Sequence, residues 1–154
     1  MRFYYRTMVC LLVVVLVPLS CKRVEPPTGV QYIEKYMKVT GYCKCGKCCG
    51  WSRNWRGVTV FNSGPNKGKR KRVGITASGT RAKHGTIAAD TRIYPYGTVI
   101  YVEGYGYGAV EDTGGSVKGS HIDLFFTSHE KALKWGNQQK KVRIWLPLAR
   151  KLHQ

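Results

Sequence analysis

The stretch DTGGSVKGSHIDLFF, residues 112–126, decides how this chain is interpreted. It holds Asp112 and Asp123, two of the three aspartates in the sequence, and the third, Asp90, ends the upstream segment TIAAD. With 26 Lys plus Arg against 8 Asp plus Glu, carboxylates are scarce, and these three do not occupy positions where solubility needs them. Asp123 precedes Leu-Phe-Phe, so we expect partial desolvation to raise its pKa. A carboxyl group that stays protonated near neutral pH can act as a general acid.

A structural alternative applies to the same residues. An aspartate before Thr-Gly-Gly is often a turn-former whose side chain accepts backbone N–H bonds, and Asp112 fits that description. Three aspartates in such settings weaken this alternative without removing it.

Five motifs, two of which overlap the stretch 112–126, carry a resemblance to a known family. They are GITASG at 74–79, GTIAAD at 85–90, YGT at 96–98, EDTGG with VKG at 111–119, and HIDLFF at 121–126. In order and spacing they resemble the 3D domain, which is named for three aspartates and is related to lytic transglycosylase A and the stationary-phase muralytic proteins. The match runs from about Val39 to about Leu146.

The resemblance implies a fold and an activity. The fold is a six-stranded double-psi β-barrel, and the activity is cleavage of the MurNAc-GlcNAc β-1,4 bond of peptidoglycan by one aspartic general acid. The muramyl 6-hydroxyl would attack in place of water and leave a 1,6-anhydro sugar. Asp123 matches the acid, Asp112 the residue that tunes it, and Asp90 the third, supporting aspartate. Thr76, Lys118 and Gly114 lie in the same motifs and are the candidate substrate-binding residues.

Composition agrees with a small β-rich protein. A chain of 154 residues allows one domain plus a leader, and its 18 Gly and 10 Tyr with short apolar runs favour an all-β fold of tight turns. The net charge is +18, or +16 once a leader with two arginines is removed. Such a field concentrates polyanions, so peptidoglycan and anionic envelope polymers are the expected partners.

The N-terminal segment predicts export. Residues 1–20 have the pattern of a signal peptide, with two arginines before an apolar core too short to span a membrane as a helix. Cys21 follows Leu-Ser and is a lipidation candidate, although Pro18 stands where Leu is usual; plain secretion or a retained anchor is the alternative. An envelope location argues against nucleic acid as a partner, and we expect a monomer.

The remaining chain divides into segments. Residues 21–36 are expected to be a linker because of Pro26-Pro27, residues 37–148 the barrel domain, and residues 149–154 a basic tail. Alternation and turn signals predict strands at 37–42, 86–90, 98–102, 122–127 and 142–146, and a short arm at 58–61. One helix over 131–135 is expected between the N-cap Ser128 and Gly136.

Four cysteines crowd the loop 43–49, namely Cys43, Cys45, Cys48 and Cys49. Four thiolates can close a zinc site, but such sites usually pair two separate turns. Disulfides suit an oxidising compartment, although adjacent cysteines do not normally bond each other. A redox-active or heavy-metal loop is the third possibility. Disulfides are favoured over structural zinc, and no cofactor is expected.

An insertion at 51–72 departs from the compact family pattern. Its basic run 67–72 predicts a solvated loop or an anchor on anionic wall polymer, and Trp51 and Trp55 could stack on sugars or cover the barrel.

Two rival functions follow from the residues. Asp-Thr-Gly is also the aspartic protease tripeptide, but those enzymes need two such loops, and this chain has one. The other rival is a non-catalytic cationic module that binds the cell wall, in which the aspartates only brace turns.

Overall fold

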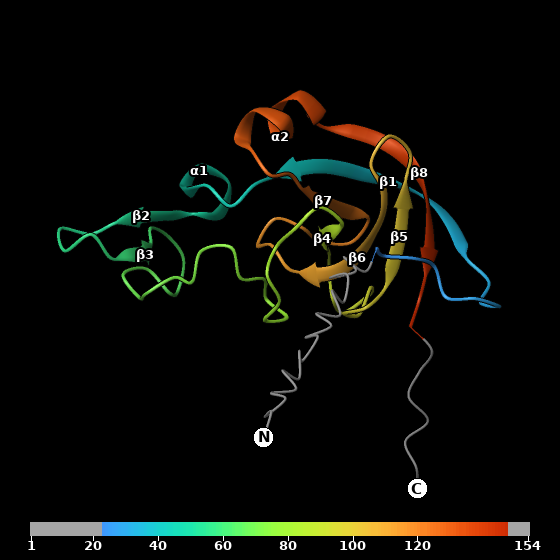
Figure 1. Ribbon diagram of the computed structural model, residues 1–154, viewed down its shortest axis with the longest axis horizontal. Helices are drawn as coiled ribbons and strands as arrows, with labels where there is room; N and C mark the ends of the chain where they lie inside the picture. The colour runs from blue at the N-terminus through green and yellow to red at the C-terminus, as the bar shows by residue number, and fades with distance from the viewer. Residues whose placement is uncertain (1–22, 148–154) are drawn as a thin grey trace, which may run out of the picture.

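The computed structural model describes residues 23–147, in which six strands close a barrel in the order β1-β7-β4-β6-β5-β8 (Figure 1). The predicted signal peptide, Cys21 and the basic tail lie outside the described residues. The barrel strands are β1 (Ile33–Tyr42), β4 (Thr86–Ala88), β5 (Val99–Val102), β6 (Gly106–Asp112), β7 (His121–Phe125) and β8 (Gln138–Trp145). The other elements are α1 (Gly46–Cys49), β2 (Trp51–Arg53), β3 (Thr59–Phe61) and α2 (His129–Trp135).

The strand pairing mixes directions, as expected for the predicted double-psi barrel. Strand β1 runs parallel to β7 and β4 runs parallel to β6, whereas the other neighbouring pairs in the barrel are antiparallel. The predicted fold class, an all-β chain with a six-stranded barrel and one short helix, is therefore confirmed. The helical turn α1, within the Cys-rich loop, was not predicted.

The barrel interior is filled by aliphatic side chains from every strand. Ile87, Ile100, Ile122, Leu124 and Val142 have no exposed surface, and they belong to one apolar cluster. Because side chains alternate along a strand, the residues between them face outward. The outer face of the barrel therefore presents the polar side chains of β6 and β7.

Strand β1 begins at Ile33, which corrects the predicted linker of residues 21–36 at its C-terminal end. Residues 33–36 are all exposed, so no apolar alternation marks them as a strand in the sequence. They are extended because they pair antiparallel with β8, from Ile33 opposite Ile144 to Tyr36 opposite Lys141. Backbone pairing with a distant strand decided this boundary.

Helix α2 lies across β1 where β1 has a glycine. The Ser128 side chain caps the helix by accepting a hydrogen bond from the Lys131 N–H at 3.3 Å, and Gly136 ends it, which confirms the predicted helix. A Cβ at Gly41 would lie 3.0 Å from the Ala132 carbonyl oxygen. This close approach holds the start of α2 beside the Cys-rich loop that follows β1 (Figure 1).

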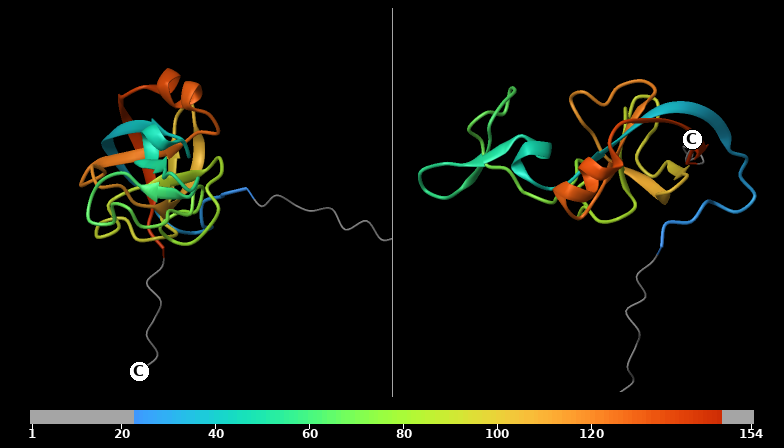
Figure 2. Two further views of the ribbon diagram at one scale, coloured as in Figure 1. Left: turned by 90° about the vertical axis from the view of Figure 1, so that its left-hand side faces the viewer. Right: turned by 90° about the horizontal axis from the view of Figure 1, so that it is seen from above.

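The insertion at 51–72 forms a hairpin lobe of its own. Strands β2 and β3 pair only with each other as a two-stranded sheet, and the lobe projects sideways from the barrel (Figure 2). The predicted arm at 58–61 is β3, and the basic run after it returns along β3 through a bridge between Val60 and Arg70. Among residues 23–147, neither helix has the length or the apolar run needed to span a membrane.

The tightest backbone approach in the barrel gives a stability prediction. A Cβ on Gly108 would lie 2.7 Å from the Gly85 carbonyl oxygen and 2.7 Å from Ile87 side-chain atoms. We expect Gly108→Ala to lower the free energy of unfolding by about 1–3 kcal/mol, measured by urea denaturation, because the backbone must shift. Gly115→Ala is the control: its Cβ meets nothing within 4 Å, so a change within about 0.5 kcal/mol is expected. Equal losses in both variants would contradict the argument.

Candidate active site

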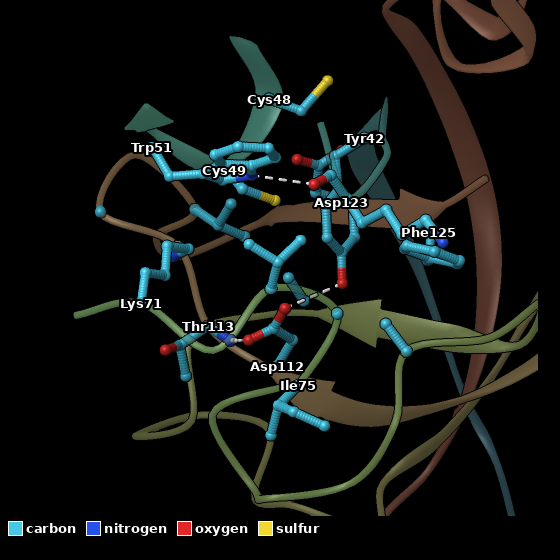
Figure 3. A pocket seen from close by; sticks show the side chains of 18 of the residues that line it. Tyr42, Cys48, Cys49, Trp51, Lys71, Ile75, Asp112, Thr113, Asp123 and Phe125 are labelled. Atoms are coloured by element: carbon cyan, nitrogen blue, oxygen red, sulfur yellow. Dashed lines mark hydrogen bonds between the residues drawn. The ribbon is translucent and has the colours of Figure 1, made fainter. Parts of the chain in front are cut away.

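A pocket of about 310 Å³ lies between the outer face of the barrel and the hairpin lobe (Figure 3). The barrel contributes five of its lining residues: Tyr42, Ala88, Asp112, Asp123 and Phe125. The Cys-rich loop and the lobe contribute Lys44, Cys48, Cys49, Trp51 and Lys71, and the loops 73–75 and 113–117 supply much of the remaining wall. Two of the three predicted aspartates therefore meet in one cavity.

The barrel register brings Asp112 and Asp123 together across β4. Ala88 pairs with Asp123 of β7 on one side and with Asp112 of β6 on the other. Two strand spacings separate the two aspartate backbones by roughly 10 Å, and the small Ala88 side chain leaves the space between them open. A register shift between Ile87 and Ala88 sets this alignment, since such a bulge re-aims the side chain opposite it.

Asp112 is surrounded by hydrogen-bond donors. Its Oδ1 accepts from the backbone N–H groups of Ala77 and Thr113, both at 2.9 Å, and its Oδ2 accepts from the Tyr42 hydroxyl at 2.9 Å (Figure 3). Burial raises the pKa of Tyr42 far above its usual value, so the phenol stays a donor. Asp112 thus fixes the loop at 76–79 and also braces a turn, which is the structural alternative stated above.

Asp123 has a different environment. It is half-buried on β7, and its Oδ1 accepts a single hydrogen bond, from the Thr40 hydroxyl at 2.9 Å. Burial raises the pKa of Asp123, and the nearby Asp112 carboxylate raises it further, whereas the Thr40 hydrogen bond and the charge of His121 lower it. The direction agrees with the expectation from sequence. Among residues 23–147, no hydrogen bond reaches Oδ2 of Asp123, which leaves that oxygen for a ligand in the pocket.

Thr40 connects Asp123 to His121. The Thr40 oxygen lies 2.9 Å from Nε2 of His121, and Nδ1 of His121 lies 3.1 Å from the Ser116 carbonyl oxygen. A carbonyl only accepts, so Nδ1 carries a proton. When Nε2 is bare it accepts from the Thr40 hydroxyl, and the Thr40 oxygen can then accept from a protonated Asp123. When Nε2 is protonated, the hydroxyl donates to an ionised Asp123. The chain Asp123–Thr40–His121 can therefore hold one proton at either end.

Asp90 is not among the residues that line the pocket. Its side chain is 2% exposed and forms a two-point contact with Arg92, from Nε to Oδ1 at 2.9 Å and from Nη2 to Oδ2 at 2.8 Å. Oδ2 also accepts from the Gly119 N–H at 3.2 Å. The Arg92 guanidinium holds the pKa of Asp90 well below its usual range. Asp90 therefore anchors the loop between Asp112 and Asp123, and the structure does not bring it to the reacting groups.

The predicted substrate-binding residues divide in the same way. Gly114 lines the pocket, whereas Lys118 is exposed and does not. Thr76 is 5% exposed, and its hydroxyl lies 2.9 Å from that of Thr80 and 3.1 Å from that of Ser78. Thr76 shapes the loop that donates Ala77 N–H to Asp112, and its own hydroxyl is engaged within the loop.

Several lining residues were missed as site candidates. Tyr42, Lys44 and Lys71 line the pocket although they come from two segments far from the aspartate motifs. The alternation of β1 could have shown that Thr40 shares a face with Tyr42, since the two residues are two positions apart on one strand and side chains alternate between faces. The lysines carried no such signal, because the chain has 26 Lys plus Arg and only the fold selects among them.

The four cysteines are free thiols, and no disulfide joins any of them in the described part of the chain. The favoured disulfide prediction is thus not what the structure shows. Cys43, Cys45 and Cys48 converge on His129, with one possible ligand atom from each residue and all four atoms within 4.8 Å of one another. Cys49 is not part of this cluster; it lines the pocket beside Cys48, and burial raises the pKa of its thiol to about 11.

Comparison with known proteins finds similarity to one family model and to two proteins named for the cell wall. Residues 85–147 match the family model described as the 3D domain. Over 123 residues, 80% of this chain, it is 39% identical to the cell wall-binding protein YocH of Bacillus subtilis, and over 75 residues, 46% of the chain, 41% identical to YabE of the same organism, named for cell wall shaping. The chain spans 37% of YocH and 18% of YabE, well under half of either relative.

Solved structures of MltA from E. coli are also similar. One crystal structure of MltA aligns with 47% of this chain and 27% of its own, at 22% identity and a TM-score of 0.39. A structure of MltA with bound chitohexaose aligns over 47% of this chain and 28% of its own, again at 22% identity and a TM-score of 0.39.

The anchoring role of Asp90 predicts a pH-dependent stability difference. Because its folded pKa is depressed, Asp90 contributes stability above its ordinary pKa of 3.8, and that contribution is lost as pH falls towards the folded value. We expect Asp90→Asn to lower the urea midpoint at pH 7 and the gap from the wild type to narrow below pH 3.8. The exposed Glu103→Gln is the control and should change little. A gap that is the same at pH 7 and pH 3 would contradict this role.

Proposed function

We propose that the protein binds peptidoglycan glycan strands and cleaves their MurNAc-GlcNAc β-1,4 bond as a lytic transglycosylase; the match of residues 85–147 to the 3D domain model supports this. The observation that carries the proposal is the setting of Asp123: half-buried, raised in pKa, and with one carboxyl oxygen open to a pocket that also holds Asp112. The names of YocH and YabE support the cell wall as the substrate.

The proposed reaction needs one acid and no water. Protonated Asp123 gives its proton to the glycosidic oxygen as the C1–O bond breaks. The muramyl 6-hydroxyl then forms the new C1–O6 bond and loses its proton to the Asp123 carboxylate. Protons balance over the cycle, and the products are a 1,6-anhydromuramyl end and a free 4-hydroxyl. A single carboxyl group is sufficient because the nucleophile belongs to the substrate, unlike the two-carboxylate hydrolases.

Asp112 and the Thr40–His121 pair act on Asp123 in opposite directions. Asp112 favours the protonated acid before the bond breaks, because two nearby carboxylates resist a second negative charge. Thr40 and His121 favour the ionised form that is left after proton transfer. A general acid whose two protonation states are both supported can donate and then recover its proton.

The pocket walls suit an anionic sugar polymer. Lys44 and Lys71 line the cavity opposite the aspartates, and a muramyl residue carries a lactyl group whose stem peptide ends in carboxylates. Trp51 also lines it, with its indole N–H donated to the Lys44 carbonyl oxygen at 2.9 Å, which fixes the ring for contact with a sugar face. The net charge of +18 draws wall polymer to the whole surface.

A second candidate function is binding without cleavage. It is favoured by the three donors on Asp112, which give this residue a structural role in any case, and by the name of YocH as a cell wall-binding protein. We propose an exported, envelope location for either function, with Cys21 as the candidate lipid anchor. The two functions differ in whether Asp123 transfers a proton to the glycosidic oxygen.

Replacement of the acid separates the two candidates. With purified sacculi as substrate, we expect Asp123→Asn to reduce release of anhydromuropeptides by at least about 100-fold, measured by mass spectrometry, because a general acid contributes that much or more. Sedimentation with the same sacculi should show unchanged binding. The exposed Glu103→Gln serves as the matched carboxylate control and should keep full activity. A wild-type protein that binds sacculi and releases no anhydro product would leave the binding function.

The pH dependence of cleavage tests the groups around the acid. Activity needs protonated Asp123, so it should fall as pH rises through the raised pKa of Asp123, above the ordinary value of 3.8. Thr40→Val removes a hydrogen bond that lowers this pKa, so the falling limb should move to higher pH. Asp112→Asn removes a charge that raises it, so the limb should move to lower pH. Initial rates measured from pH 4 to pH 9 give the limb; an identical limb in all three proteins would assign the titration to another group.

A further inference from the structure

We propose that Cys43, Cys45, Cys48 and His129 bind one Zn²⁺ ion, and that this ion fastens the Cys-rich loop and the hairpin lobe to the barrel. The three thiol sulfurs and Nδ1 of the imidazole lie within 4.8 Å of one another. Three Cys and one His are a recurrent ligand set of structural zinc sites. The site is separate from the carboxyl chemistry of the pocket and does not depend on it.

Four of the six distances between the ligand atoms lie close to the edges of a zinc tetrahedron. With Zn–S near 2.3 Å and Zn–N near 2.0–2.1 Å, tetrahedral angles give roughly 3.8 Å between two sulfurs and roughly 3.6 Å between sulfur and nitrogen. The sulfurs of Cys43 and Cys48 are 3.7 Å apart. Nδ1 of His129 lies 4.0 Å from the sulfur of Cys43, 3.6 Å from that of Cys45 and 3.3 Å from that of Cys48. Four side chains packed for apolar contact alone have no reason to aim four donor atoms at one point.

The fourth cysteine is left out of the cluster by its position on α1. Cys48 and Cys49 are adjacent, so their side chains leave the helical turn in different directions. The sulfur of Cys49 donates to the Cys43 carbonyl oxygen at 3.1 Å and lines the pocket. This arrangement gives each member of the adjacent pair a different role, and it makes Cys49 a natural control.

The local backbone is built to gather the three sulfurs. Cys45 precedes α1 in an extended conformation, and its N–H points at the sulfur of Cys43 at 3.5 Å, so the backbone supplies a donor to that sulfur. A Cβ on Gly46 would collide with the Trp51 carbonyl oxygen, and Gly50 ends the turn in the left-handed region at φ 57°. Glycine is needed at both positions, and together they close the loop tightly enough for the three sulfurs to face one centre.

A seven-residue loop has little room to supply all four ligands of a zinc ion, and here α2 supplies one of them. His129 is the first residue of α2 and follows the end of the loop by 80 residues in sequence. It reaches the sulfurs because α2 crosses β1 at Gly41, two residues before Cys43. Two separate chain segments therefore meet at the site, as they usually do in structural zinc sites.

The position of the site gives the ion a mechanical role. Lys44, Cys49 and Trp51 form pocket wall and lie within or just after the loop that carries the three sulfurs. Within residues 23–147, the β2–β3 hairpin that follows shares no sheet with a barrel strand. An ion shared with His129 would tie this wall to the helix on the opposite side of the loop. Cys48, one of the proposed ligands, lines the pocket itself, so the shape of the pocket then depends on the metal.

Metal analysis of the purified protein tests the proposal directly. We expect one zinc per chain by plasma mass spectrometry after gel filtration. Replacement by Co²⁺ should give the visible absorption of a tetrahedral ion together with thiolate-to-cobalt charge-transfer bands in the near ultraviolet. An intact mass, measured after denaturation without reductant, should show four reduced thiols in the loop.

Variants identify the ligands. His129→Gln and Cys45→Ser should each lower zinc affinity by more than about 100-fold in competition with a chromophoric chelator, since even the loss of an outer hydrogen bond to a ligand costs 10- to 100-fold. Cys49→Ser, adjacent to a ligand, should bind zinc like the wild type. If a ligand variant does not fold, hydrogen exchange on the wild type serves: chelation should speed exchange in residues 43–61 and leave β5 and β6 unchanged.

The contrary results are equally defined. An intact mass lower by two hydrogens per disulfide, in protein purified without oxidant, would replace the metal site by disulfides. Reduced protein that takes up no zinc or cobalt would also overturn the proposal. Equal loss of metal in Cys49→Ser and Cys45→Ser would overturn the ligand assignment, and unchanged exchange in the loop after chelation would remove the mechanical role.

Discussion

The alternation of β7 inside a closed barrel is the constraint on which the candidate site depends. Ile122 and Leu124 have no exposed surface and fill the barrel, so Asp123 between them must face outward. Closure of the barrel fixes the register of β7 against β4 and of β4 against β6, which aligns Asp123, Ala88 and Asp112 in one row. A slip of one residue in either pairing would turn an aspartate into the apolar interior. Because burial of an unpaired carboxylate is unfavourable in free energy, such a slip is disfavoured and the two aspartates stay aligned.

The two aspartates of this row are treated in opposite ways by their surroundings. Asp112 receives three hydrogen bonds and holds together β1, the loop at 76–79 and its own turn. Asp123 receives one hydrogen bond and is desolvated, with a free oxygen in the cavity. The same residue type thus serves as a brace at one position and as a candidate acid at the other. Asp90 completes the arrangement from outside the pocket, where Arg92 and Gly119 use both of its oxygens.

The wall opposite the aspartates has a different origin from the barrel. It comes from the Cys-rich loop and the hairpin lobe, which stand beside the barrel and share no sheet with it (Figure 2). The barrel carries Asp112 and Asp123, and the lobe side supplies Lys44 and Lys71 to the facing wall of the same cavity. The attachment of the lobe is therefore as important for the cavity as the aspartates, and the convergence of three thiols on His129 lies at the point of attachment.

Local patterns in the sequence were sufficient for a β-rich chain, the helix from Ser128 to Gly136, and the desolvation of Asp123, because alternation, caps and apolar neighbours are short-range signals. The double-psi barrel itself was implied by the resemblance to the 3D domain. The first four residues of β1, 33–36, gave no such signal, since they are exposed and only pairing with β8 makes them a strand. Other features involve segments tens of residues apart. Thr40 contacts both His121 and Asp123, and His129 meets the three thiols. Asp90, in contrast, lies away from the pocket. The placement of Asp90 and the Thr40–His121 contact depend on barrel closure, and the position of His129 depends on the crossing of α2 over Gly41. Barrel closure and this crossing are properties of the tertiary structure alone.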